Sequence, residues 1–358
     1  LLAIIMTVLE ASAFIFGGQY GLLDLEVALL VLAQLTASGI IVLLLDELVQ
    51  KGWGLGSGVS LFILAGVAQQ IVWLSFSPVG PLPDGKSLGA LIAFGQTLLA
   101  GDNILSAFVR TPYPDMTGFI TMIGVFLFVV YLEGMRIEVP VAYAKYGGFR
   151  AKVPLKFLYV SNIPIILASA LFANIMLLGT FLWNNFNRDN SNFLLNLIAK
   201  YNVTAPGAAP TPLPGSLVYY LSPPRGPVSV MADPVHAVLY TIILVSVSTL
   251  FAIVWVEVAG MSARSQAEQL IKAGLQVPGF RRSPKVIEQL LNRYIPPLTV
   301  LSGIIVALLA AFADMLGALG GGIGILLSVG IIYQYYQILA KEKLAEMYPA
   351  LGKLLGQE

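Results

Sequence analysis

Eight long apolar runs, separated by polar or glycine-rich segments, dominate the pattern of hydrophobic and polar positions in this chain. The runs are continuous and lack the strict alternation of apolar and polar residues found in the strands of a membrane β-barrel. A helix needs about 20 residues to cross ~30 Å of hydrocarbon, and the runs reach or approach that length. The pattern therefore predicts an all-α, polytopic membrane protein with transmembrane helices at residues 1–17, 24–45, 56–76, 115–132, 157–183, 235–258, 295–316 and 322–339.

The composition agrees with this class of protein. Hydrophobic residues make up 57% of the chain and charged residues 11%, which is more apolar surface than a soluble domain could bury. The chain has no cysteine, which excludes disulfides and thiolate chemistry, and its only histidine, His236, lies at the start of a predicted span. No metal-ligand cluster, His-based triad or pair of intramembrane aspartates is apparent, so we expect neither a cofactor nor an enzyme.

The cations are sorted between alternate gaps. The second, fourth and sixth gaps and the C-terminal tail hold fifteen of the twenty Lys and Arg residues. The positive-inside rule places these segments in the cytoplasm and the other gaps outside. The first long outer gap, 77–114, contains an apolar stretch at 88–100 that we expect to lie along the membrane interface.

Two of the inner gaps, 133–156 and 261–294, are long and basic. Residues 133–154 and 261–294 are polar and partly helical in pattern, with short helices expected at 267–273 and 284–293. Docking of a large anionic partner, such as a ribosome, would use loops of this kind. Positive-inside bias also produces such loops, and the loops alone favour this simpler explanation.

Glycine clusters open the third and eighth spans, at 52–58 and 317–324, from opposite sides of the membrane. Inverted repeats with glycine-interrupted helices are a common arrangement in transport proteins. Glycine also permits close packing of helices, so the clusters favour transport only modestly. A secondary transporter for a small solute and a passive scaffold subunit both stay open at this point.

Two carboxylates stand out within or beside the apolar runs. Glu10 lies in the middle of a span, where a charge costs about 2.5–3.5 kcal/mol on insertion scales, so it should face protein or water and have a partner. Asp314 lies near a span end, where solvation or pairing at the interface suits a carboxylate.

Five segments carry a resemblance to a known family. They are LDELVQKGWGLGSGVSLFI at 45–63, VYLEGMRIEVP at 130–140, PLKFLYVSNIPIILASALFAN at 154–174, RYIPPLTVLSG at 293–303 and GALGGGIGILL at 317–327. Together they resemble the SecY family, the α-subunit of the Sec protein-conducting channel, in its archaeal and eukaryotic form.

The resemblance implies an architecture and a function. The eight spans correspond to helices three to ten of a ten-helix channel with pseudo-twofold inverted repeats, without the first two helices, the plug and one wall of the lateral gate. Residues 1–114 would be the remainder of the N-terminal half and residues 115–358 the C-terminal half, with cytoplasmic loops at 133–156 and 261–294. Such a channel moves unfolded secretory polypeptides across the membrane and releases hydrophobic segments sideways into lipid.

The resemblance also assigns residues to a pore. An aliphatic constriction makes no specific hydrogen bond with a substrate and dewets when empty. The family's motifs place Val59, Ile63, Ile166 and Leu327 in this ring. Pro164 should kink its helix near the constriction and is a candidate hinge.

Further roles follow from the same resemblance. Glu10 and Asn174 would belong to a polar cluster at the lateral gate, or form a structural bond between helices. Arg281 and Arg282, with Arg150 and Lys152 as looser candidates, would dock the ribosome, or the motor ATPase in bacteria. The expected partners are SecE/gamma-type and beta-type small subunits in a heterotrimer, signal sequences, nascent polypeptides and membrane lipid. The expected location is the cell membrane, or the endoplasmic reticulum in a eukaryote, with a cytoplasmic C-terminus.

Overall fold

The computed structural model describes residues 2–17, 20–21, 23–52, 57–143, 149–203, 210–272, 275–276 and 284–347. The chain packs as two compact units, described separately here. Unit 1 comprises Leu1–Gln70, Ala170–Pro224 and Ile331–Glu358, and unit 2 comprises Ile71–Ser169 and Arg225–Gly330. Three of the boundaries fall inside helices, so α3, α7 and α15 each contribute to both units. The predicted division into 1–114 and 115–358 follows chain order and stays a prediction.

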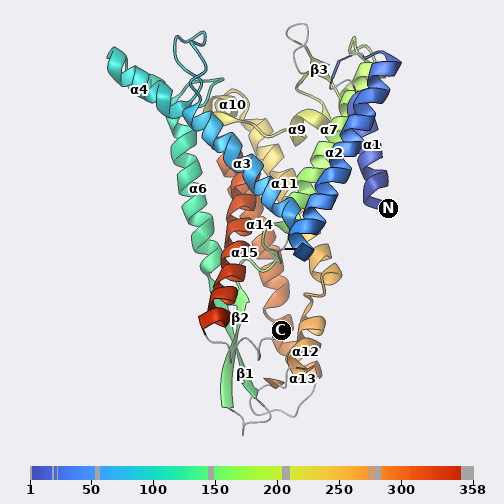
Figure 1. Ribbon diagram of the computed structural model, residues 1–358, viewed down its shortest axis with the longest axis vertical. Coiled ribbons are helices and arrows are strands. Elements are labelled where there is room, and N and C mark those ends of the chain that lie inside the picture. Colours follow the sequence, from blue (N-terminus) through green and yellow to red (C-terminus); the bar gives the residue numbers. More distant parts are fainter. Residues whose placement is uncertain are drawn as a thin grey trace. The chain divides into compact units, whose positions relative to one another are not determined.

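All eight apolar runs form helices, which confirms the predicted class (Figure 1). Seven of these helices are long and apolar enough to cross a membrane within the described part of the chain, whereas α1 has 15 residues and is shorter. The eight are α1 (Leu2–Phe16), α2 (Leu25–Gly52), α3 (Gly58–Phe76), α6 (Met116–Gly134), α7 (Ile163–Phe186), α11 (Pro234–Val258), α14 (Ile295–Met315) and α15 (Gly322–Met347).

In unit 1, α1 packs against α2 at a glycine. A Cβ on Gly39 of α2 would meet the methyl group of Thr7 on α1, so only glycine permits this approach. The far end of α1 is held by α7, because Asn184 Nδ2 donates a hydrogen bond to the Gly17 carbonyl at 2.6 Å.

The end of α7 is anchored by the segment that follows it. Trp183 and Tyr201 pack with ring centroids 5.5 Å apart, and the Thr180 hydroxyl donates to Tyr201 Oη at 3.1 Å. A Cβ on Gly179 would collide with Val218, so this segment lies tightly on α7. Burial raises the pKa of Tyr201 despite the Thr180 bond, which keeps its hydroxyl protonated. The segment contains α8 (Phe193–Ile198), β3 (Tyr201–Asn202), β4 (Thr211–Pro212) and α9 (Leu217–Leu221).

In unit 2, α14 is the central helix and packs along α11 (Figure 1). Gly303 lies against Thr249 and Ala252, where an added Cβ would sit 3.1 Å from the Ala252 methyl group. Ser248 donates across the same contact to the Gly303 carbonyl at 3.5 Å. Small residues thus bring the two helices close together, as is usual where lipid gives helices no hydrophobic reason to associate.

The helix ends of unit 2 gather in the two groups that the charge pattern predicts. Gly118 at the start of α6 lies against the Gly317 carbonyl between α14 and α15, and Gly317 lies against Gly226, which begins α10 (Gly226–Ala232). These ends are all predicted to lie outside. At the other group of ends, Tyr159 Oη donates to the Met261 carbonyl at 2.6 Å. The alternation of the spans is confirmed within unit 2, and which group faces the cytoplasm stays a prediction.

The first basic loop is a β-hairpin and not partly helical, contrary to expectation. Residues 133–154 were expected to be partly helical, but the segment forms an antiparallel hairpin of β1 (Arg136–Tyr143) and β2 (Phe149–Lys156), with β5 (Leu275–Gln276) beside β1. The period is two: Val139 and Leu155 are buried, whereas Glu138 and Lys152 are exposed and form an ion pair. In the second basic loop, α12 (Ala263–Lys272) and α13 (Pro284–Asn292) confirm the two expected helices.

A pair of glycines in α6 tests the packing of unit 2. Gly118→Ala should lower the thermal unfolding midpoint of the purified protein, because its methyl group would collide with the Gly317 backbone, and overpacking costs about 1–3 kcal/mol. Gly124→Ala in the same helix meets no atom within 4 Å and should leave the midpoint unchanged or raise it. Equal midpoints for the two variants would contradict the contact.

Candidate functional site

The start of α3 is closed by an aspartate from the preceding helix. The Val59 amide in the first turn of α3 donates to Asp46 Oδ1 at 2.9 Å, and the Ser57 hydroxyl donates to the same oxygen at 3.4 Å. The first amides of a helix have no partner within the helix, so a carboxylate at this place satisfies one of them and interacts favourably with the helix dipole. Asp46 therefore fixes the backbone that carries the predicted pore residue Val59.

Two more side chains hold this junction together within unit 1. Gln50 Nε2 donates to Asp46 Oδ2 at 2.7 Å, and Tyr335 Oη on α15 donates to the Ser57 carbonyl at 3.0 Å. A Cβ on Gly58 would lie 2.9 Å from the Asp46 Cα atom, so glycine is needed for α3 to begin this close to α2. The junction connects α2, α3 and the C-terminal part of α15.

Asp314 closes α15 in the same way. The Gly322 amide donates to Asp314 Oδ1 at 2.7 Å, and a Cβ on Gly322 would collide with the Ala310 backbone of α14. Asp314 is buried and paired, so of the two environments expected for it, pairing is the correct one.

In unit 2, Asn162 joins α7 to α15. Asn162 lies just before the first turn of α7, is 5% exposed, and donates through Nδ2 to the Leu326 carbonyl of α15. The neighbouring Gly330 admits this side chain, because a Cβ there would collide with it. The predicted pore residue Ile166 follows Asn162 by one helical turn, and Leu327 follows Leu326. The bond therefore anchors α7 to α15 at positions close in sequence to both predicted pore residues.

All four predicted pore residues have aliphatic side chains that are at least partly exposed. Val59, Ile63 and Ile166 are exposed, and Leu327 is partly exposed between the buried Leu326 and Ser328. Val59 and Ile63 are four residues apart and therefore lie on one face of α3. The first two belong to unit 1 and the last two to unit 2, so their convergence around one axis stays a prediction.

Pro164 does not kink its helix. The predicted span began at residue 157, but α7 begins at Ile163, and Ser161 just before it has φ of 52°. Pro164 thus lies in the first turn, where the missing amide interrupts no hydrogen bond and the fixed φ suits helix initiation. The expected kink near the constriction is wrong, and a hinge role for Pro164 is untested.

Glu10 and Asn174, the predicted gate residues, both lie in unit 1. Asn174 Nδ2 donates to the Ala170 carbonyl in its own helix at 3.0 Å. Glu10 is exposed on α1, and no hydrogen bond or ion pair joins it to another described side chain. A bond between Glu10 and Asn174 is absent from this part of the chain, and their gate role stays a prediction.

The predicted docking residues lie in the basic loops. Lys152 is exposed on β2 and paired with Glu138 of β1. Arg150 is on the same strand, opposite Ala142 in the register. Arg281 and Arg282 lie outside the described residues.

Comparison with known proteins identifies the family of the chain. The model of the SecY family matches residues 1–336. The chain is 41% identical to the SecY protein translocase subunit of Aeropyrum pernix, with 100% of this chain and 74% of that protein covered. The chain belongs to the SecY family. For the Pyrococcus furiosus SecY subunit the identity is 44%, with 99% and 75% covered.

Solved SecY-type channels have the same fold. A structure of a protein-conducting channel superposes with a TM-score of 0.77 at 41% identity, covering 98% of this chain and 73% of that one. Sec61 in the canine ribosome–channel complex from the endoplasmic reticulum gives 0.74 at 40% identity, with the same shares covered. The chain is thus a membrane-embedded subunit of a protein-conducting translocase, and the solute-transporter alternative falls.

Two side chains at the site, Asp46 and Asn162, were missed by sequence reasoning. Asp46 is 13 residues from its amide partner and Asn162 is 164 residues from its carbonyl partner. A capping residue normally lies within three residues of the amide it satisfies, so no local pattern marks either one. The one available signal was their position inside the segments that carry the SecY resemblance.

Replacing Asp46 tests the closure of α3. Asp46→Ala should speed hydrogen exchange at the Val59 amide by about fivefold, because loss of a capping side chain costs ~1 kcal/mol. Exchange can be followed by mass spectrometry on the peptide that covers the start of α3. Glu47→Ala is the matched control, because within the described part of the chain Glu47 pairs with exposed Lys51 and does not contact the Val59 amide, whose exchange should stay unchanged. Equal exchange in both variants would refute the capping role.

Proposed function

We propose that the chain forms the hydrophobic collar of a Sec translocase from Val59, Ile63, Ile166 and Leu327. The supporting observation is that side-chain bonds between helices anchor the backbone next to the predicted collar positions. Asp46 holds the start of α3 beside Val59, and Asn162 holds α7 to α15 beside Ile166 and Leu327.

The collar would work through the absence of polar groups. Aliphatic side chains offer no hydrogen bond to water or ions, so a narrow ring of them dewets when empty. An unfolded polypeptide of any sequence can pass, because no contact in the ring depends on its side chains. Anchoring the backbone while the side chains stay partly exposed suits a ring that must adapt to a passing chain without dissolving its helices.

The lateral gate is a further part of the proposal. Glu10 lies on α1 in unit 1, exposed and unpaired among the described residues, and Asn174 lies on α7. A carboxylate at membrane depth is costly without a partner. We place its partner on another segment of the assembled translocase, where breaking the bond would accompany the sideways release of a hydrophobic segment.

The surroundings of the channel complete the proposal. The basic loops would face the cytoplasm and dock a ribosome, or a motor ATPase in a bacterium, and small SecE/gamma-type and beta-type subunits would complete a heterotrimer. The C-terminus would be cytoplasmic, in the cell membrane or in the endoplasmic reticulum of a eukaryote. In this arrangement the chain is a conduit and not an enzyme.

Crosslinking tests the collar. Because the chain has no cysteine, single cysteines can replace Ile63, Ile166 or Leu327 in the full-length translocase. Each should crosslink to a cysteine in a stalled translocating polypeptide, because the collar surrounds the substrate. Band shifts on gels measure the yield.

The controls for this test lie on the same helices. Ala65, Leu171 and Ile332 are also exposed but point roughly 140–160° away from Ile63, Ile166 and Leu327 around the respective helices. Cysteines there should give at most a tenth of the yield. Equal yields from both sets would remove the collar assignment while leaving the family membership intact.

Charge reversal tests the docking loops. Arg281→Glu should weaken ribosome binding several-fold and reduce its salt dependence, because a cation that contacts RNA phosphate releases counterions. Lys343→Glu on α15 reverses an exposed charge outside the basic loops and should have a smaller effect. Co-sedimentation of ribosomes with translocase vesicles over a salt series measures both, and indistinguishable curves would count against docking through Arg281.

A further inference from the structure

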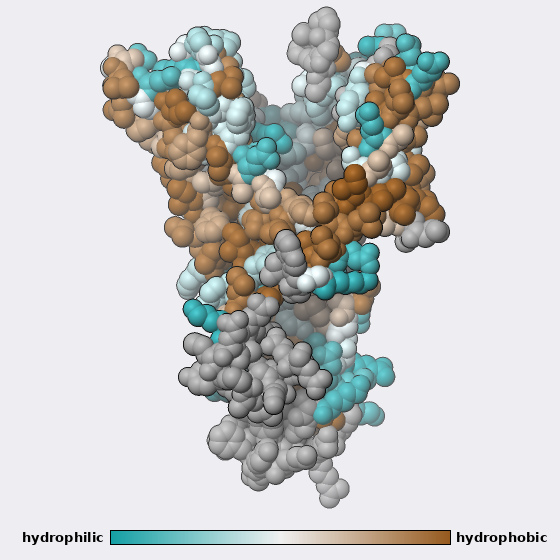
Figure 2. Space-filling view, viewed as in Figure 1, coloured by the Kyte–Doolittle hydropathy of each residue, from teal (hydrophilic) through white to brown (hydrophobic). Residues whose placement is uncertain are grey.

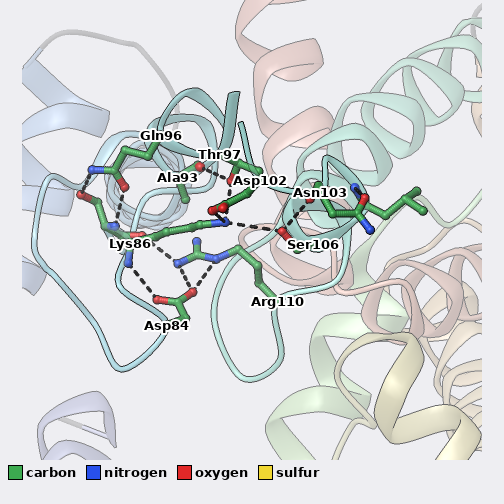
Figure 3. A network of polar contacts seen from close by, with 11 residues as sticks. Asp84, Lys86, Ala93, Gln96, Thr97, Asp102, Asn103, Ser106 and Arg110 are labelled. Atoms are coloured by element: carbon green, nitrogen blue, oxygen red, sulfur yellow. Dashed lines mark hydrogen bonds and ion pairs between the residues drawn. The ribbon is translucent and has the colours of Figure 1, made fainter. Parts of the chain in front are cut away.

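The loop between α3 and α6 pairs its charged side chains within itself and exposes large apolar side chains, which is the reverse of a loop that lies in water. Residues 77–114 contain four charged side chains, and all four are used in two ion pairs within the loop, Arg110 with Asp84 and Lys86 with Asp102 (Figure 3). The loop therefore presents no unpaired charge to its surroundings, although such segments usually do when they lie in water.

Arg110 is the centre of the first pair. It is 6% exposed and donates to Asp84 Oδ2 through Nε and Nη2, at 3.0 and 2.7 Å. It also donates to the carbonyls of Ser87 and Pro114. Burial disfavours the charged form of Asp84, but the Arg110 bonds and the Lys86 amide outweigh it and hold the pKa of Asp84 below its usual value.

Lys86 bonds to the polar side of α4 (Ala90–Ala100), which faces the interior of the loop. Its Nζ donates to Thr97 Oγ1 at 2.9 Å and to Ser106 Oγ at 3.4 Å, and Thr97 is fully buried. Gln96 bonds to both the amide and the hydroxyl of Ser87. The polar residues of α4, Gln96 and Thr97, are thus hydrogen-bonded within the loop.

The apolar residues point the other way. Leu98, Leu99, Ile104 and Leu105, called here the leucine tip, lie at the end of α4 and the start of α5 (Leu105–Phe108). Leu99 is 92% exposed and Leu105 is 72% exposed. Figure 2 shows hydrophobic colour over the end of α4. The tip is not loose, because Phe94 and Phe108 pack edge to face at 6.2 Å between the two helices.

The position of the loop indicates what covers this tip. Trp73 and Phe76 are exposed on the last turn of α3, directly before the loop, and α6 begins directly after it with exposed Ile120. Aromatic residues at the end of a transmembrane helix mark the level of the lipid headgroups. The leucine tip therefore continues the lipid-facing surface of α3 and α6 at the boundary between hydrocarbon and water.

We propose that the leucine tip inserts into the headgroup–acyl boundary of the bilayer on the face predicted to be outside. A helix that lies in this boundary buries its apolar side in lipid, and the internal ion pairs spare the loop the cost of bringing unpaired charges there. The tip would hold the ends of α3 and α6 at a fixed depth. This anchor is independent of the collar and of any translocating substrate.

Fluorescence quenching in vesicles tests the anchor. Leu99→Cys and Leu105→Cys in the full-length translocase complex, labelled with bimane and reconstituted in phosphatidylcholine vesicles, report on the tip. The matched control is Pro83→Cys, an exposed position on the turn beside Asp84. Lipids brominated near the glycerol should quench the two tip labels at least twofold more than the control label, and aqueous iodide should show the reverse order.

Two outcomes would overturn the anchor. Iodide quenching at the tip as strong as at residue 83 would place the tip in water. Protection from both quenchers would show that a partner protein covers it. Neither outcome bears on the collar, which crosslinking tests separately.

Discussion

The structure depends on the need to satisfy backbone groups at helix ends, because hydrocarbon offers them no water. Asp46 meets this need at the start of α3, and Asp314 meets it at the start of α15. In both cases the carboxylate comes from the end of the preceding helix, and a glycine, Gly58 or Gly322, brings the new helix against it. The two glycine-rich openings, which the sequence suggested are related by inverted symmetry, thus share one capping device in atomic detail.

The spans could be predicted because long apolar runs leave the chain few choices in lipid. The grouping of their ends in unit 2 followed from the sorting of Lys and Arg, and contacts such as Gly118 with Gly317 confirm it. The hairpin of β1 and β2 differs from the expectation because its basic residues are also typical of a cytoplasmic loop. The alternation that leads to buried Val139 beside exposed Glu138 is a strand signal and was available in the sequence. The start of α7 was misplaced because apolar residues 157–160 extend the run, although Phe157, Tyr159 and Val160 pack in a cluster with α13 and α14 before the helix begins at Ile163.

The candidate site was predictable only through the family. Composition and periodicity cannot separate Ile166 from other aliphatic residues that face lipid, since both environments favour the same side chains. The bonds beside the proposed collar positions are also invisible to local patterns, because Asn162 and Leu326 meet only when α7 and α15 are packed. Sequence reasoning therefore found side chains that could face the substrate and missed those that hold them in place.

The degree of burial explains why different helices suit different tasks. In the most apolar stretch of α14, half of the residues are buried, largely against α11. In the corresponding stretches of α2 and α3, only 6% of the residues are buried. A helix packed along its length, as α14 is at Gly303, resists displacement because every turn would lose contacts. The start of α3 is held by Asp46, Ser57 and Tyr335, and little of the rest of the helix packs against other described residues. A channel that admits chains of differing width suits both kinds of helix, and the anchored end of α3 carries the proposed collar residue Val59.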